Sequence, residues 1–172
     1  MAKNSKGFRI AINKKAILEG VIADMRKDCE KLVKEAFETA TFTERTGNLA
    51  DSYGAAIYED GKLREETMAY RTIKATETKD WYTRSNIGGH GEMLNFFRDY
   101  KPKSKGIAIV LVAAMPYTEV LERGSAGLHH KYKVISGAYS LLQDLTEKYN
   151  GKRGYKRYKF GRGVRVSITN IG

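Results

Sequence analysis

The side chains that most often carry catalysis are sparse in this 172-residue sequence, and they do not combine into a catalytic set. His129 and His130 could bind a metal, but no cysteine, acid or further histidine lies at ligand spacing from them. Ser52 has no histidine near it in the sequence that could act as its base. The paired carboxylates Glu65 and Glu66 fall in a predicted hairpin, where nothing suggests the shared burial needed for acid–base work. We therefore expect no enzyme, no metal ion and no cofactor.

A glycine-rich segment, Gly88-Gly89-His90-Gly91, could in principle hold a phosphate group. Glycines at the start of a helix let backbone N–H groups approach an anion closely. The segment lacks the lysine and the Ser/Thr of a nucleotide-binding phosphate loop, so we interpret it as a mobile loop. The single cysteine, Cys29, excludes an internal disulfide. It falls on the apolar face of a predicted helix, which is typical of a small buried hydrophobe.

The net charge of +11 comes from the two ends of the chain. Residues 1–15 carry five basic side chains and residues 151–172 carry seven, with no acid in either segment, so the 135 residues between them sum to −1. A protein that binds nucleic acid with its folded surface normally spreads lysine and arginine over one face. We therefore divide the chain into one near-neutral domain, residues 1–150, with a basic N-terminal segment, and a basic C-terminal arm, residues 151–172.

The C-terminal arm interleaves basic and aromatic side chains. This composition suits docking onto an acidic protein partner with the rings as anchors, and it also suits phosphate contact with base stacking. A solvated tail is the third interpretation, and we rank the three in that order. The residues expected to make these contacts are Lys152, Arg153, Tyr155, Lys156, Arg157, Tyr158, Lys159 and Arg162.

Hydrophobic periodicity predicts an α+β fold that begins with a long helix and a hairpin. Alternation over residues 8–12, within the basic N-terminal segment 1–13, indicates a short strand. Apolar residues then recur at three- and four-residue steps over residues 14–41, which predicts one amphipathic helix laid on a sheet. Residues 53–59 and 62–73 are predicted to be two strands, joined by an Asp-Gly turn of type I′.

The second half of the chain adds a central strand and a second long helix. We treat residues 75–105, the least regular stretch, as an insertion that contains one short helix. The continuous apolar run 107–114 predicts a central strand buried on both faces, and Pro116 suits the first turn of a short helix after it. A helix over residues 134–149 and an alternating pattern over residues 164–168 follow. The expected fold is a long N-terminal helix and a C-terminal helix packed on a small, mainly antiparallel sheet.

Composition bears on where such a protein would work. The apolar fraction of 41% is enough for a core in a single domain. No stretch approaches the roughly 20 apolar residues that span a bilayer, and no apolar run follows the basic start as in a secretory signal. We expect a soluble protein of the cytosol or of a host cytoplasm, with no membrane partner.

Two segments resemble signatures of one known family. Residues 46–52 (Thr-Gly-Asn-Leu-Ala-Asp-Ser) resemble the Thr-Gly-x-Leu-x-x-Ser signature of the tail-completion, or neck, proteins of long-tailed bacteriophages. Residues 117–125 (Tyr-Thr-Glu-Val-Leu-Glu-Arg-Gly-Ser) resemble the family's Tyr-Ala-x-x-Val-Glu-x-Gly-Thr segment. The order of the expected elements also agrees over about residues 14–149. Two departures are Thr118, where the family has a small alanine, and Arg123, where an aromatic residue is common.

The resemblance implies a non-enzymatic virion protein, assembled in the host cytoplasm, that forms a homo-oligomeric ring in the neck or upper tail. Its neighbours would be connector and tail-tube or terminator proteins, and DNA would pass through the ring. The alternative function that the residues leave open is nucleic-acid binding through the basic termini. The motif residues that the resemblance singles out are Thr46, Gly47, Leu49, Ser52, Tyr117, Glu122 and Gly124.

Physical roles can be assigned to several motif residues. Thr46 suits the cap of a short helical turn, Gly47 a close backbone approach, and Leu49 a place in the core. Glu122 would end a helix, where its charge opposes the helix dipole. We therefore expect Glu122 to pair with a basic group of its own subunit or of the next one. We expect the apolar residues of that helix, among them Val120, to face inward.

Overall fold

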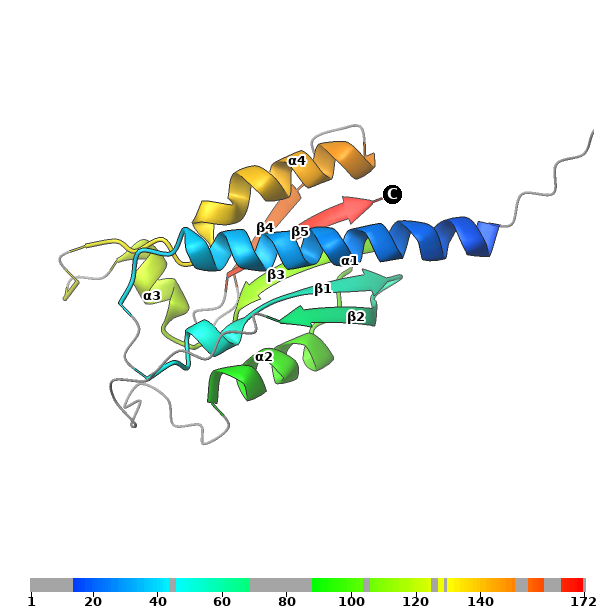
Figure 1. The fold of residues 1–172 in the computed structure, drawn as a ribbon. Coiled ribbons are helices and arrows are strands. Elements are labelled where there is room, and N and C mark those ends of the chain that lie inside the picture. The colour runs from blue at the N-terminus through cyan, green and yellow to red at the C-terminus, as the bar shows by residue number, and fades with distance from the viewer. Residues whose placement is uncertain are drawn as a thin grey trace, which may run out of the picture.

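A long helix, α1 (Lys14–Glu38), lies across one face of an antiparallel sheet in the computed structural model of the chain (Figure 1). The structure describes residues 14–43, 46–68, 88–103, 106–124, 127–128, 130–150, 155–159 and 165–171. The other elements are η1 (Ala50–Ser52), β1 (Tyr53–Glu59), β2 (Lys62–Met68), α2 (Gly88–Asp99), β3 (Ile107–Ala113), α3 (Thr118–Arg123), η2 (Ser136–Ala138), α4 (Tyr139–Asn150), β4 (Tyr155–Lys159) and β5 (Arg165–Ile171). The expected α+β fold is confirmed.

The sheet has five strands in the order β2-β1-β3-β5-β4, and every neighbouring pair is antiparallel. Its middle strand is β3, all seven residues of which are buried. The prediction of a central strand at this position is therefore confirmed. The turn between β1 and β2 has positive φ at both Asp60 (48°) and Gly61 (79°), as the type I′ prediction requires.

Alternate residues of the central strands feed two cores, one on each face of the sheet. Ile109 and Leu111 belong to the larger core, which α1 and α4 cover. Val110 and Val112 point the other way, into a smaller core with Phe97 of α2. Figure 1 shows the resulting order of layers, with α1 and α4 on one side of the sheet and α2 on the other. The continuous apolar run of β3 is thus explained by burial on both faces.

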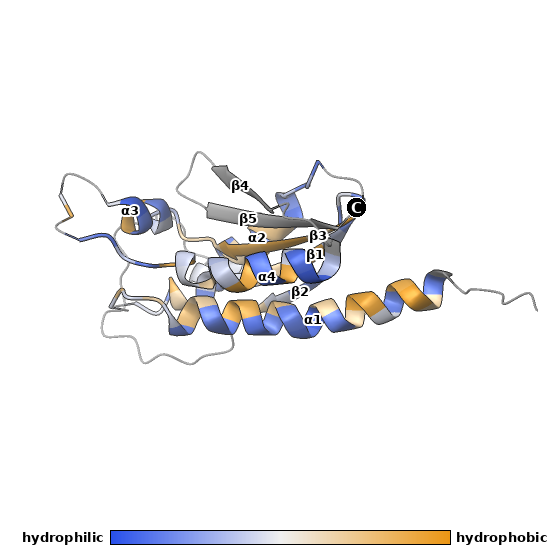
Figure 2. Cartoon of the chain, turned by 90° about the horizontal axis from the view of Figure 1, so that it is seen from above, coloured by the Kyte–Doolittle hydropathy of each residue, from blue (hydrophilic) through white to orange (hydrophobic). Residues whose placement is uncertain are grey.

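The predicted apolar stripe of α1 is the part of the helix that contacts the sheet. The hydropathy colouring of Figure 2 shows apolar and polar residues alternating along α1. The helix ends at Glu38, three residues before the predicted end, because the chain turns at Thr39 and the N–H of Thr41 binds the carbonyl of Lys133 (3.0 Å). The buried residues of the stripe are Ile22, Met25, Cys29, Leu32, Val33 and Ala36. Cys29 is a buried hydrophobe, as predicted.

Two predictions about the middle of the chain are wrong. Gly88-Gly89-His90-Gly91 is the first turn of α2 and not a loop. The helix itself covers the second face of the sheet, so this part of the supposed insertion is a layer of the fold. The glycines are needed for packing, because a Cβ on Gly89 would overlap the backbone carbonyl of Asn48. Helix propensity alone argues against a glycine-rich start, and tertiary packing overrides it here.

The arm interpretation does not hold for two segments of the C-terminal tail. β5 pairs with β3 from Val112↔Val166 to Ile107↔Ile171, and β4 pairs with β5. The alternating pattern over residues 164–168 correctly predicted a strand there. Its partner could not be predicted, because β3 and β5 are far apart in sequence. Without β5, one edge of the buried strand β3 would lack backbone partners.

Some predictions fall outside the described residues. These are the short strand at residues 8–12, the basic segment 1–13 up to its last residue, and residues 69–73 of the returning strand. Two helix starts differ from prediction, because α3 begins two residues after Pro116 and α4 begins at Tyr139 instead of residue 134. Within the described part of the chain, none of the helices has the length and apolar character to cross a membrane.

Candidate assembly site

The two motif segments of the sequence lie at the same end of the sheet. The carbonyl of Ser52, the last residue of the first motif, accepts the N–H of Ala114 at the end of β3 (3.1 Å). The next residue, Tyr53, pairs with Ala113 in the sheet. We call this region, residues 46–52, 114–124 and 130–135, the motif corner.

The first motif forms a compact turn that anchors the start of β1. The hydroxyl of Thr46 accepts the N–H of Asn48 (3.3 Å), and Gly47 has a φ of 81°, which glycine adopts without strain. Ser52 donates its hydroxyl to the carbonyl of Leu49 (2.8 Å), and the Leu49 side chain is 2% exposed in the larger core. Leu49 therefore has its expected role. Thr46 binds a nearby amide as expected, although the residue preceding η1 is Leu49 and it makes no side-chain cap.

Glu122 is a buried carboxylate that binds backbone N–H groups. The side chain is on α3, and the residue is 8% exposed. Its Oε2 atom accepts the N–H groups of Val134 (2.9 Å) and Ile135 (3.0 Å). The sequence analysis expected a basic side chain at this carboxylate, whereas the structure places two backbone donors there. These donors precede η2 and α4, so the negative charge lies at the start of a helical segment, where it is favourable.

The segment that Glu122 holds, residues 132–135, is also bound by α1 and β1. Lys133 exchanges two bonds with Thr41, because its N–H donates to the Thr41 hydroxyl (2.9 Å) and its carbonyl accepts the Thr41 N–H (3.0 Å). The Tyr53 hydroxyl donates to the carbonyl of Val134 (2.8 Å). Backbone groups committed to these partners are not free for helical bonds. This explains why α4 starts later than the apolar pattern predicted.

One face of α3 is buried in the corner and the other is exposed. Thr118 and Glu122 are buried four positions apart, so Val120 falls on the opposite side and is 44% exposed. The expectation that Val120 faces inward is therefore wrong. Arg123 and Glu119 form an ion pair along the helix. The Thr118 hydroxyl is buried and has no hydrogen-bond partner within the described part of the chain.

Gly124 and Tyr117 bracket this helix. Gly124 has a φ of 75°, and its N–H binds the carbonyl of Val120 (2.8 Å). A Cβ there would also lie 3.1 Å from Cγ of Lys131, so both backbone and space favour glycine. Tyr117 is half-buried against the larger core, and its carbonyl accepts the N–H of Leu121 (3.1 Å). The motif residues thus mainly shape the corner.

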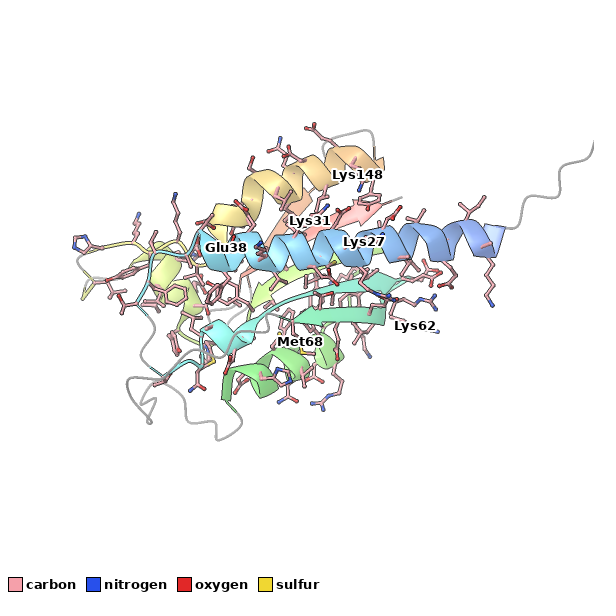
Figure 3. All side chains as sticks on the ribbon, viewed as in Figure 1. Lys27, Lys31, Glu38, Lys62, Met68 and Lys148 are labelled. Carbon is pink, nitrogen blue, oxygen red and sulfur yellow. The ribbon has the colours of Figure 1, made fainter. Side chains whose placement is uncertain are left out.

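A second buried carboxylate, Asp28, was assigned to the polar side of its helix by the sequence pattern. Its side chain is 4% exposed and accepts bonds from Lys148 Nζ (2.7 Å) and the Tyr149 hydroxyl (2.6 Å). Lys31 Nζ lies 3.4 Å away. Figure 3 labels Lys31 on α1 and Lys148 on the last turn of α4. This cluster, which we call the Asp28 latch, fixes the end of α4 on the middle of α1.

The latch sets the acidity of its members. Burial alone would raise the pKa of Asp28, but the hydrogen bonds from Lys148 and Tyr149 and the nearby lysine charge outweigh burial and lower it. Burial raises the pKa of the neighbouring Cys29 thiol to about 12, with the Asp28 charge adding to the effect. Cys29 is therefore a thiol and not a nucleophilic thiolate at neutral pH.

The expected contact residues of the C-terminal tail are only partly placed. Tyr155, Lys156, Arg157, Tyr158 and Lys159 form β4, an edge strand of the sheet. The remaining three residues of that set fall outside the described part, as does one of the two adjacent histidines. Among the described residues, no three His, Cys, Asp or Glu side chains are grouped so that they could hold a metal ion.

No protein-family profile, no curated protein and no solved structure matches this chain. The likeness to tail-completion proteins therefore depends on the two motif segments and their arrangement.

Proposed function

We propose that this protein is a structural subunit of a tailed phage, without enzymatic activity, that assembles as a ring in the neck or upper tail. The observation that carries the proposal is the bond between Ser52 and Ala114, which joins the two motif segments into one corner. Segments that are distant in sequence and adjacent in the fold are better treated as one signature than as two separate coincidences. That signature is the one that resembles the tail-completion family.

The motif corner supports this function by presenting α3 on a rigid base. Its backbone groups are held by α1, β1 and the Glu122 carboxylate, so the exposed side of α3 has a fixed orientation. A fixed surface binds a neighbour with little loss of conformational freedom. In the proposed particle the ring lies between connector and tail-tube or terminator proteins, and DNA passes through its opening.

Light scattering coupled to size-exclusion chromatography tests the ring. A closed ring of this 19.4 kDa chain gives one mass, a fixed multiple of the subunit, that stays constant over a wide range of protein concentrations. An open head-to-tail chain would instead give a mass that rises with concentration. A protein that remains monomeric at every concentration tested would refute the proposal.

Nucleic-acid binding is a second candidate, favoured by the position of β4. This edge strand carries three basic residues and two tyrosines. Deleting residues 151–172 would remove β5 from beside β3, so a loss of binding in that truncation would not be informative. A variant with neutral side chains keeps the strands and tests the charge. Its substitutions are Lys152→Gln, Arg153→Gln, Lys156→Gln, Arg157→Gln and Lys159→Gln.

The measurement is the dependence of DNA affinity on salt. Each lost phosphate contact lowers the slope of log affinity against log salt by about 0.9. If these residues bind DNA, the substituted variant has a shallower slope and a lower affinity than the natural chain. Equal slopes and affinities would exclude this surface as a DNA site.

A further inference from the structure

The N-terminal end of α1 extends past the sheet that the rest of the helix covers. A helix of 25 residues is about 37 Å long, whereas a seven-residue strand spans about 23 Å. Ile22 is the first fully buried residue of α1, and Ile17 is 57% exposed. Leu18 and Val21 are only partly buried at the margin of the larger core. Figures 1 and 2 both show this end of the helix projecting beyond the strands.

The exposed face of α3 lies at the opposite end of the molecule. In both views α3 is at one end and the start of α1 is at the other. Val120 is the exposed apolar side chain of this face, and half-buried Leu121 is next to it. The molecule therefore has one exposed apolar side chain on each of two distant surfaces, and the two surfaces differ in shape. Such a pair can form a head-to-tail contact, whereas an isologous contact would need one surface to complement itself.

We propose that the projecting end of α1, at residues 15–21, packs on the exposed face of α3 in a second copy of this chain. This inference rests on the proposed ring and identifies the two surfaces that would build it. Each subunit would give one surface to the neighbour on one side and the other surface to the neighbour on the other side. The contact buries Ile17 and Val120, and it leaves Glu122 inside its own subunit.

The charges of the two surfaces complement one another. Near the start of α1, residues 15–24 carry one lysine against Glu19 and Asp24, a net charge of −1. At the motif corner, residues 117–124 and 130–133 carry three basic residues against two acids, a net charge of +1. The bases include exposed Lys131 and Lys133. Opposite charge around an apolar contact favours this pairing over contact between two like ends.

Two single substitutions test the contact, one on each surface. Ile17→Glu and Val120→Glu place a charge in the proposed apolar contact and should raise the concentration needed for assembly on the order of a hundredfold. Both sites are exposed in the subunit, so each variant should keep the circular dichroism spectrum and urea unfolding midpoint of the natural chain. The matched control is Leu63→Glu. Leu63 is 39% exposed and pairs with Tyr58, which belongs to the core on the α2 side.

Mixing the two variants gives the decisive result. The natural chain and Leu63→Glu should form rings, and each of the other variants should be monomeric by light scattering. In an equimolar mixture, Ile17 of the Val120→Glu chain can still meet Val120 of the Ile17→Glu chain. The mixture should therefore yield heterodimers that grow no further.

Other outcomes overturn the inference in distinguishable ways. If the natural chain forms rings and either Ile17→Glu or Val120→Glu also does so, the surfaces are wrong and the ring stands. If both variants are monomeric and the mixture yields no heterodimer, the contact is not head-to-tail between these surfaces. If the natural chain itself is monomeric, the proposed function fails and this inference fails with it.

Discussion

The Glu122→Ala substitution tests the role assigned to the motif corner. In the natural chain the carboxylate accepts the N–H groups of Val134 and Ile135, both of which are residues with 0% exposure. Alanine leaves both buried donors without this acceptor, and each such group costs about 1–3 kcal/mol. We therefore expect the free energy of unfolding to fall by about 2–5 kcal/mol. Glu122→Gln keeps one acceptor oxygen without the charge, so its loss should be smaller, about 1–2 kcal/mol.

Two measurements check this prediction at the same protein concentration for all variants. Urea unfolding gives the overall loss of stability, and hydrogen exchange reports the Val134 and Ile135 amides individually. Glu119→Ala is the control on the same helix, because it removes an ion pair with Arg123 at the surface and should cost less than about 1 kcal/mol. If Glu122→Ala unfolds like the natural chain and both amides stay protected, the carboxylate does not hold this segment. The physical account of the corner would then be refuted.

Three further predictions follow from other buried groups. Asp28→Asn should lower stability at neutral pH by about 1–3 kcal/mol, because charge-assisted hydrogen bonds are lost. The pKa of Asp28 is lowered in the folded protein, so its contribution is present above the ordinary value of 3.8 and disappears as the pH falls through the folded-state pKa. The difference between the two proteins in urea should shrink below about pH 4, and a difference independent of pH would contradict the latch. Thr118→Val replaces a buried, unpaired hydroxyl and should stabilise the protein by up to about 1 kcal/mol, and a clear loss in thermal unfolding would show that the hydroxyl is bonded. Gly89→Ala should lower the melting temperature because its Cβ has no space, whereas Gly20→Ala, with nothing within 4 Å, should gain about 0.5–1 kcal/mol; similar effects from both substitutions would overturn the packing assigned to α2.

The local elements of the fold could be predicted from the sequence. The three- and four-residue steps of α1, the Asp-Gly turn between β1 and β2, and the apolar run of β3 each specify a structure through neighbouring residues. Their boundaries agree with the structure to within a few residues where the chain is described. The α+β architecture followed from combining them.

The features that were missed depend on residues far apart in sequence. Asp28 has a polar side-chain type on the flank of an amphipathic helix, and only the approach of Lys148 and Tyr149 from α4 makes it a buried acceptor. The acceptor role of Glu122 depends on the chain returning past α3 at Val134. The starting glycines of α2 are explained by the backbone of Asn48 and not by helix propensity. No local pattern contains these contacts.

The central claim is that this chain forms closed rings, and negative-stain electron microscopy of the purified full-length protein tests it most directly. The account predicts class averages that show rings of one diameter with a central opening. For the Ile17→Glu and Val120→Glu variants it predicts only particles of monomer size. Particles of monomer size for the natural chain at every concentration, or open filaments in place of rings, would contradict it.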